Sequence, residues 1–308
     1  MSSAVVFAYH NVGVRCLSVL LHHGVRVPLV VTHRDNPAEN IWFDSVEKLA
    51  RLHGIPVITP DDPNTAEVVA KVAVAQPDFL FSFYYRNMLK KALLDIPTRA
   101  AYNMHGSLLP NYRGRVPVNW AIIHGERETG ATLHAMNEKP DNGAIVAQQA
   151  VPILINDTAK DVFDKVTVAA EMALDGVLSA LLVGRAPHRG QDLTQGAYFG
   201  GRKPEDGRID WRQDALAIHN FVRALSRPYP GAFADVAGRR MIVWRTIPGA
   251  GPAPASAGAG VRLEAADGAL ILFSTDGWLR VVDLELAGHP VPPADFAMAF
   301  GGSSIQLA

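Results

Sequence analysis

Residues 1–32 read MSSAVVFAYHNVGVRCLSVLLHHGVRVPLVVT and predict one strand–helix–strand unit. Residues 4–8 (AVVFA) form a short apolar run that is typical of a buried strand. Apolar side chains recur at helical spacing over residues 14–21, and Gly24 stands where the helix is expected to stop. Residues 27–32 (VPLVVT) predict the second strand. A helix between two buried strands indicates that they pair in parallel through a right-handed crossover.

The same alternation continues downstream. A helix is expected between Asp44 and Gly54, then a third strand at 55–58, a helix at 65–75 and a fourth strand, FLFSF, at 79–83. Strands that alternate with helices are typical of a mainly parallel sheet covered by helices on both faces. The sequence therefore predicts an α/β protein with a Rossmann-like domain.

The first turn argues against a dinucleotide cofactor. After the first strand the chain reads AYHNVGV (residues 8–14), with the single glycine Gly13 and no G-x-G-x-x-G pattern. The missing glycines are those that let the backbone approach a pyrophosphate. An NAD-dependent oxidoreductase is therefore disfavoured.

The character of the chain changes after its longest expected helix, at residues 158–182. Residues 188–210 are polar and glycine-rich, and short alternating runs begin near residue 232. Short strands separated by glycine and proline predict a small β-barrel or sandwich. We expect a Rossmann-like catalytic domain over residues 1–203 and a small C-terminal β-rich (OB-like) domain over residues 204–308, with a flexible loop at 248–260.

Composition places the protein among soluble globular chains. Of 308 residues, 48% are hydrophobic and 19% are charged, and the formal net charge is −1. A charge so near zero gives no general attraction to nucleic acid or to anionic membranes. The single cysteine, Cys16, excludes an internal disulfide, and the N-terminus has no signal-peptide pattern. No apolar stretch approaches the roughly 20 residues of a membrane-spanning helix, so we expect a cytoplasmic protein without membrane insertion.

The segment that carries chemistry is NMHGSLLPNYRGRVPVNWAIIHGERETGATLHAMNEKPD, residues 103–141. Its start follows the apolar AAY and so lies where a strand ends, and the carboxyl ends of parallel strands border the ligand crevice of such sheets. Asn103 and His105 are two residues apart, which places both side chains on one face of an extended backbone. Asp141 stands in PDNG, a common turn sequence. Taken singly, each of the three is more typical of a turn or of a satisfied structural residue.

The string as a whole resembles the signature of the folate-dependent formyltransferases. It reads N-x-H-G-S-L-L-P-x-Y-R-G-R-x-P-x-N-W, followed by TGATLHAM and by D-x-G-A-I. That family includes the formyltransferases of methionyl-tRNA, of glycinamide ribonucleotide and of sugar nucleotides. The resemblance implies an enzyme that moves a formyl group from its co-substrate, 10-formyltetrahydrofolate, to a primary amine without a metal.

Other segments are similar to one branch of this family. They are VVFAYHNVG (5–13), THRDNPAEN (32–40), FSFYYRN (81–87) and RPYPGAF (227–233). They most closely resemble the formyltransferase domain of the bifunctional polymyxin-resistance enzyme, which formylates UDP-4-amino-4-deoxy-L-arabinose in lipid A modification. The bifunctional enzyme carries a decarboxylating dehydrogenase after this region and the present chain does not, so we expect another polypeptide to supply that oxidative step.

The resemblance also implies a role for each residue. Asn103 is expected to donate a hydrogen bond to the formyl oxygen as negative charge develops there. His105 is expected to be the second donor, and Asp141 to orient His105 and to accept the proton that leaves the amine. The residues expected near the folate are Asn87, Met88, Leu89, Arg115, Asn137, Glu138, Lys139 and Pro140, and those expected near the acceptor are His10, Tyr84, Tyr85 and Arg86. No metal-ligand spacing is apparent, because His22 and His23 are expected on a helix surface and His134 in a strand.

Charge and composition favour a small acceptor. Recognition of tRNA draws much of its affinity from lysine and arginine contacts with phosphate. The net charge is −1 and the C-terminal part has no basic run, so nucleic acid is not the expected partner. UDP-4-amino-4-deoxy-L-arabinose is the favoured acceptor. Another amino-sugar nucleotide or methionyl-tRNA is the alternative, and a folate-binding protein of the same fold is the non-enzymatic one. The sequence leaves homo-oligomerisation open.

Overall fold

The computed structural model describes residues 2–254 and 259–307, so residues 255–258 of the predicted loop lie outside the described residues. The chain forms two compact units. Unit 1 comprises Met1–Pro117, Glu128–Pro152 and Phe163–Gly200, and unit 2 comprises Val118–Arg127, Ile153–Val162 and Gly201–Ala308. The domain boundary predicted between residues 203 and 204 stays a prediction.

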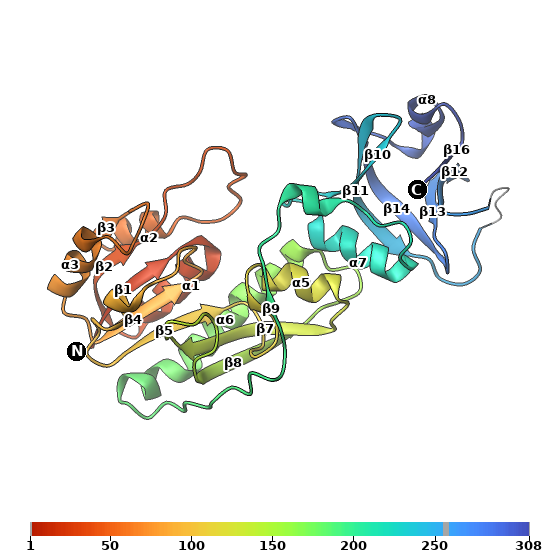
Figure 1. Cartoon of the computed structure of the whole chain (residues 1–308). Helices are drawn as coiled ribbons and strands as arrows, with labels where there is room; N and C mark the ends of the chain where they lie inside the picture. The colour runs from red at the N-terminus through yellow and green to blue at the C-terminus, as the bar shows by residue number, and fades with distance from the viewer. Residues whose placement is uncertain (1, 255–258, 308) are drawn as a thin grey trace. The chain divides into compact units, whose positions relative to one another are not determined.

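Unit 1 is built on a seven-stranded sheet with the order β3-β2-β1-β4-β5-β7-β8 (Figure 1). Neighbouring strands from β3 to β5 pair in parallel, whereas β7 runs antiparallel to both β5 and β8. The predicted mainly parallel, Rossmann-like sheet is confirmed, with an added antiparallel edge. Its strands are β1 (Ser3–Ala8), β2 (Arg26–Val31), β3 (Val57–Ile58), β4 (Phe79–Phe83), β5 (Ala100–His105), β7 (Glu128–Ala135) and β8 (Ile145–Pro152).

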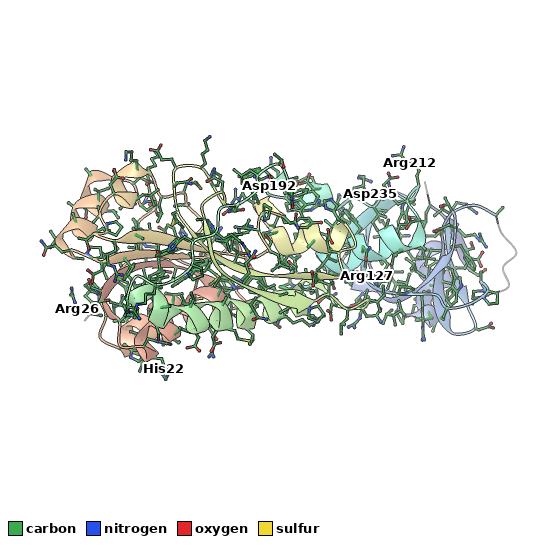
Figure 2. The ribbon with its side chains drawn as sticks, turned by 90° about the horizontal axis from the view of Figure 1, so that it is seen from below. His22, Arg26, Arg127, Asp192, Arg212 and Asp235 are labelled. Atoms are coloured by element: carbon green, nitrogen blue, oxygen red, sulfur yellow. The ribbon has the colours of Figure 1, made fainter. Side chains whose placement is uncertain are left out.

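Helices cover both faces of this sheet. On one face, Val68, Val72 and Leu93 of α3 and α4 join apolar side chains of β1, β2 and β4 in a single core. The helices α1 and α6 lie on the other face (Figure 2). Ser45 and Thr65 cap α2 and α3 through their side-chain oxygens, so the N-cap of α2 is Ser45, one residue after Asp44, where the sequence suggested the helix start. The helices are α1 (His10–His22), α2 (Val46–Leu52), α3 (Ala66–Val74), α4 (Lys91–Leu94) and α6 (Ala159–Leu182).

A short parallel ribbon within unit 1 fixes the chain after β5. It pairs β6 (Arg113–Gly114) with β9 (Tyr198–Phe199). Gly114 has a left-handed backbone, and a Cβ at this position would lie 2.2 Å from the carbonyl oxygen of Phe199. Only glycine fits here, and its backbone N–H is thereby held at a fixed place.

Unit 2 contains an antiparallel sheet with the order β10-β11-β14-β13-β12-β16, and β15 pairs with β14. Ile218 and Val222 of α7 (Ala215–Leu225) join Met241 and Leu279 of the sheet in one apolar core. The predicted β-rich C-terminal domain is confirmed as an antiparallel half-barrel. The other elements are η1 (Pro204–Gly207), β10 (Ala232–Val236), β11 (Arg239–Pro248), β12 (Arg262–Ala266), β13 (Ala269–Phe273), β14 (Trp278–Leu286), β15 (His289–Pro290), η2 (Pro293–Asp295), α8 (Phe296–Phe300) and β16 (Ser304–Gln306).

Two segments from the middle of the chain, 118–127 and 153–162, belong to unit 2. Asn119, on α5 (Pro117–Ile123), donates from Nδ2 to the carbonyl oxygen of Ala224 at 2.7 Å. Arg223 donates to the carbonyl oxygens of Leu154 at 3.1 Å and of Asp157 at 2.9 Å. Hydrogen bonds with α7 therefore hold both segments, one to its backbone and the other from the side chain of Arg223. Within the described residues, no helix combines the length and apolar character needed to cross a membrane.

Candidate active site

The strand order of unit 1 reverses between β1 and β4. The chain places β2 and β3 on one side of β1 and then returns to add β4 on the other side. In open α/β sheets, ligands bind at the carboxyl ends of the strands beside such a reversal. His10 and Tyr84 follow these two strands and have left-handed backbone, with φ of 66° and 56°. Non-glycine residues in this conformation collect at functional sites.

Asn103 lies on β5 directly opposite His134 on β7, and the two side chains meet. Asn103 Nδ2 is 3.1 Å from His134 Nε2, and His134 Nδ1 is 2.9 Å from the carbonyl oxygen of Ala135. A carbonyl oxygen only accepts, so Nδ1 carries a proton and Nε2 of the neutral ring is the acceptor. Asn103 therefore donates one amide proton to His134 and keeps a second for a ligand oxygen.

His105 is the last residue of β5 and is buried, with 6% of its surface exposed. Its Nε2 donates to the carbonyl oxygen of Tyr112 at 2.8 Å, and its Nδ1 lies 3.5 Å from Oδ1 of Asp141. Burial lowers the pKa of His105, so the ring is neutral at pH 7 and Nδ1 carries a lone pair. A proton that reaches Nδ1 is then stabilised by the neighbouring carboxylate.

Asp141 is buried beside two histidines. Its Oδ1 lies 3.5 Å from both His105 Nδ1 and His134 Nε2, and its Oδ2 accepts from the backbone N–H of Gly114 at 2.8 Å. Burial alone raises the pKa of Asp141, but the proximity of the His105 and His134 rings and the hydrogen bond from the Gly114 N–H outweigh it and hold the pKa at about 2. The carboxylate is therefore ionised at neutral pH.

The structure brings Asn103, His105 and Asp141 into one cluster and adds His134 to it. The second amide proton of Asn103 suits a developing oxyanion. His105 uses its Nε2 proton for Tyr112, so it becomes a second donor only by exchanging that carbonyl for the formyl oxygen. The arrangement as it stands suits proton acceptance at Nδ1, beside Asp141.

A buried hydroxyl holds the loop that follows His105. Thr132 Oγ1 donates to the carbonyl oxygen of Ser107 at 2.6 Å. It accepts from the backbone N–H of Leu109 at 3.1 Å and from Gln148 Nε2 at 3.0 Å. The loop is therefore tied to β7 and β8, which limits how far His105 can shift.

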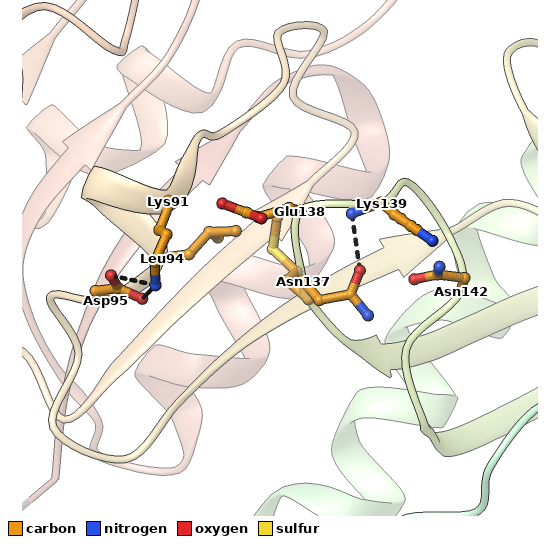
Figure 3. Close-up of a pocket in the computed structure, with 8 residues that line it drawn as sticks. Lys91, Leu94, Asp95, Asn137, Glu138, Lys139 and Asn142 are labelled. Atoms are coloured by element: carbon orange, nitrogen blue, oxygen red, sulfur yellow. Dashed lines mark hydrogen bonds and ion pairs between the residues drawn. The ribbon is translucent and has the colours of Figure 1, made fainter.

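A cavity of 430 Å³ is lined partly by residues 136–139 and 142, which flank Asp141 in the sequence (Figure 3). Lys91 and Asp95 form an ion pair at one side, and Asn137 accepts from the backbone N–H of Lys139 at 2.8 Å. Asn142 Oδ1 is buried and has no hydrogen-bond partner among the described residues, so it suits a ligand N–H. The lining residues are Lys91, Leu94, Asp95, Met136, Asn137, Glu138, Lys139 and Asn142.

The other residues expected near the folate do not line this cavity, although Pro140 lies between two that do. Asn87 donates from Nδ2 to the carbonyl oxygen of Asp61 at 3.0 Å. Leu89 is buried in the apolar core under α3 and α4, whereas Met88 is exposed. Arg115 is exposed, and its backbone N–H donates to Phe199 at 2.9 Å.

The residues expected near the acceptor lie at the carboxyl ends of β1 and β4. His10 stacks on Phe43 with 3.9 Å between ring centroids. Tyr85 is buried and stacks on His33, with 4.1 Å between ring centroids. Arg86 forms a two-pronged ion pair with Glu39 at 2.8 and 2.9 Å. Tyr84 packs edge-on against Phe163. These four side chains thus already contact other side chains of the protein.

Metal-binding residues do not gather anywhere in the part of the chain that the structure describes, since no group of three or more His, Cys, Asp or Glu side chains could hold an ion. His22 lies at the end of α1 and points away from the sheet (Figure 2).

Two family models match the chain. One, described as formyl transferase, matches residues 16–178, and the other, described as formyl transferase, C-terminal domain, matches residues 202–301. The chain belongs to the formyl transferase family. Both units of the formyltransferase thus have a counterpart in the family.

Solved structures of similar fold include enzymes that act on amino sugars. The N-formyltransferase from Helicobacter canadensis, solved with folinic acid and dTDP-3-aminofucose, is 20% identical with a TM-score of 0.69 over 94% of this chain and 100% of its own. WlaRD, a sugar 3N-formyl transferase solved in the presence of dTDP and 5-N-formyl-THF, is 21% identical with a TM-score of 0.68 over 91% of this chain and 97% of its own. HypX from Aquifex aeolicus, solved with tetrahydrofolic acid, is 18% identical with a TM-score of 0.64 over 96% of this chain and 47% of its own. At these identities the likeness establishes the fold of the formyltransferase.

His134 is the residue of this formyltransferase cluster that the sequence interpretation assigned to a plain strand. Its signal was the TGATLHAM segment, which belongs to the same signature as Asn103. Seeing that the two residues face each other requires the register of β5 against β7. Periodicity alone does not supply that register.

Proposed function

We propose that this formyltransferase moves a formyl group from 10-formyltetrahydrofolate to the primary amine of an amino-sugar nucleotide. The observation that carries the proposal is the cluster of Asn103, His105, His134 and Asp141 at the end of β5. It brings an amide donor, a neutral imidazole and an ionised carboxylate close together, and these groups suit the oxyanion and the proton transfer of formyl transfer to an amine.

The first step forms a bond between the amine nitrogen and the formyl carbon. The electron pair of the formyl C=O bond moves onto its oxygen, which becomes negatively charged. Asn103 donates its second amide proton to that oxygen. One such donor lowers the barrier by roughly 3–4 kcal/mol.

The second step moves a proton from the attacking amine to the leaving nitrogen of the folate. His105 Nδ1 takes the proton from the amine, and Asp141 at 3.5 Å stabilises the imidazolium. The imidazolium then gives the proton to the departing folate nitrogen as the C–N bond breaks. The electron pair on the oxygen re-forms the C=O bond as the C–N bond breaks. The products are the N-formylated acceptor and tetrahydrofolate, and His105 returns to its neutral form.

In this proposal the folate lies against the cavity lined by Asn137, Glu138, Lys139 and Asn142. Buried Asn142 Oδ1 offers an acceptor to the ring N–H groups of the folate. Solved structures of similar fold bind folinic acid or tetrahydrofolic acid, which supports a folate as the formyl donor. Asn87, Met88, Leu89, Arg115 and Pro140 stay predictions for contacts made once the folate is bound.

The acceptor that we favour is UDP-4-amino-4-deoxy-L-arabinose, in the modification of lipid A that accompanies polymyxin resistance. The segments 32–40 and 81–87 support it by their resemblance to the enzyme that uses this substrate. The net charge of −1 supports a nucleotide sugar over tRNA. The structures solved with dTDP-3-aminofucose and with dTDP support a nucleotide sugar as the class.

The test is to incubate the protein with 10-formyltetrahydrofolate and a panel of amino-sugar nucleotides, with charged initiator tRNA as a further acceptor. We expect formylation of UDP-4-amino-4-deoxy-L-arabinose, detected by mass spectrometry. Formylation of another sugar nucleotide alone would replace the specific acceptor, and formylation of tRNA alone would overturn the class. Folate binding without any turnover would favour the non-enzymatic alternative.

Two substitutions test the catalytic residues. Asn103→Ala and His105→Ala are each expected to abolish nearly all turnover, because one removes the oxyanion donor and the other the proton carrier. Circular dichroism of both variants should show an intact fold. Turnover at the wild-type rate in either folded variant would contradict the mechanism.

A further inference from the structure

The segment after α6 returns to the sheet of unit 1 and runs beside β8 (Figure 1). Arg189 pairs with Ile145 of β8 as an antiparallel bridge, with N–H···O distances of 2.7 and 2.8 Å. Arg189 also donates from Nη2 to Gln148 Oε1 at 2.9 Å. Gln191 follows two residues later, so its backbone position is fixed by this bridge.

Gln191 bonds to the turn that carries Asp141. Its Nε2 donates to the carbonyl oxygen of Asp141 at 3.0 Å and to that of Gly143 at 2.6 Å. Both partners only accept, so the nitrogen of the side-chain amide has to face them, and both of its protons are used. The side chain thus clamps this turn at two points.

The turn needs outside support because its backbone is strained. Asp141 has φ of 54°, in the left-handed region that a non-glycine residue occupies at a cost of order 1 kcal/mol or more. The carboxylate itself is held by a single backbone donor, the N–H of Gly114. A turn that relaxed toward ordinary backbone geometry would carry the carboxylate away from His105 and His134.

We propose that Gln191 is a positioning residue that acts through Asp141. By fixing the carbonyl oxygens of Asp141 and Gly143, it keeps the carboxylate within ion-pair distance of His105. The inference rests on the proposed formyl transfer for its catalytic consequence, but the positioning itself has a readout that does not depend on turnover.

The test uses Gln191→Glu, which keeps the shape of the side chain and replaces the donor amide by a carboxylate that faces two carbonyl oxygens. Gln195→Ala is the matched control, because Gln195 lies in the same segment, is exposed and uses its side chain to donate to Asp192 rather than to the turn of Asp141. We expect Gln191→Glu to lower kcat on the order of 10- to 100-fold with little change in either KM. The control is expected to keep the wild-type kcat.

Two further measurements separate positioning from simple loss of stability. The nearby carboxylate raises the pKa of His105, so its displacement lowers the pKa of His105 further, as followed by NMR with His105→Gln for assignment. In Asp141→Asn, adding Gln191→Glu is expected to cause no further loss of kcat, because the group through which Gln191 acts is already gone.

A Gln191→Glu protein that melts earlier but keeps the wild-type kcat and the wild-type pKa of His105 would overturn the proposal. An additive loss in the double variant would also overturn it. If the wild-type protein formylates no amine, the proposed function fails, while the shift in the pKa of His105 still decides whether Gln191 positions Asp141. Should Gln191→Glu fail to fold, Gln191→Ala, which introduces no charge, carries the same three measurements.

Discussion

The backbone of Gly143 lies so close to a neighbouring strand that one added methyl group should disable the enzyme. A Cβ at Gly143 would lie 1.8 Å from the carbonyl oxygen of Ala135, and real contacts of this kind do not fall below 3.0 Å. The obstacle is backbone in β7, so the turn has to move by about 1 Å, and a misplacement of that size costs about 10²-fold in rate. Gly143→Ala is therefore expected to lower kcat on the order of 10²-fold.

The same change should also lower the free energy of unfolding, by about 1–3 kcal/mol, as at other overpacked sites. Formylated product measured by mass spectrometry gives kcat, and urea denaturation gives the free energy of unfolding. Gly176→Ala is the control, since Gly176 lies within α6 and a Cβ there meets no atom within 4 Å. The control is expected to keep kcat and to gain up to about 1 kcal/mol of stability. A folded Gly143→Ala protein with wild-type kcat would refute the idea that the position of this turn controls the reaction.

Four other predictions follow from the site. His134→Ala removes the buried hydrogen-bond acceptor that orients the amide of Asn103. Steady-state kinetics should show kcat lower by roughly 10- to 100-fold, which corresponds to the cost of about 1–3 kcal/mol for a lost buried hydrogen-bond partner. The acid limb of the pH profile of kcat should lie below pH 6.5, because burial lowers the pKa of His105 and only the neutral ring accepts a proton. An acid limb above pH 6.5 would count against His105 as the proton acceptor. Folding lowers the pKa of Asp141, so the ionised carboxylate adds its full share to the free energy of unfolding above pH 3.8, and this share is lost as the pH falls toward about 2. In urea titrations over that pH window, the free energy of unfolding of Asp141→Asn should therefore depend less on pH than that of the wild type. In Gly106→Ala the new Cβ would lie 1.9 Å from the hydroxyl of Tyr84, so kcat should fall. Adding Tyr84→Phe removes that hydroxyl and should restore part of kcat. The absence of any rescue would show that this contact does not cause the loss.

The sequence was sufficient for the features that depend on local pattern. Alternating strands and helices predicted the parallel sheet, and the two-residue spacing of Asn103 and His105 placed both side chains on one face of β5. The antiparallel edge formed by β7 and β8 was not predicted, because strand direction there depends on pairing rather than on periodicity. That same pairing places His134 opposite Asn103.

The remaining site residues could not be predicted from the sequence because they meet through long-range contacts. Lys91 and Leu94 line the cavity from a helix four residues long, and nothing in their local sequence marks them as cavity residues. Gln191 meets Asp141 across 50 residues of chain through one β-bridge. Contacts of this kind follow from tertiary packing, which a single sequence does not display.

Segments 118–127 and 153–162 belong to unit 2, and this affects how the C-terminal half could be exchanged by gene fusion. A gene fusion that joined residues 1–203 to a foreign C-terminal half would remove the carbonyl partner of Asn119 and the guanidinium that binds Leu154 and Asp157. Both segments would then have to be redesigned together with the incoming half. Replacing the C-terminal half alone is therefore expected to destabilise the protein unless both segments change with it.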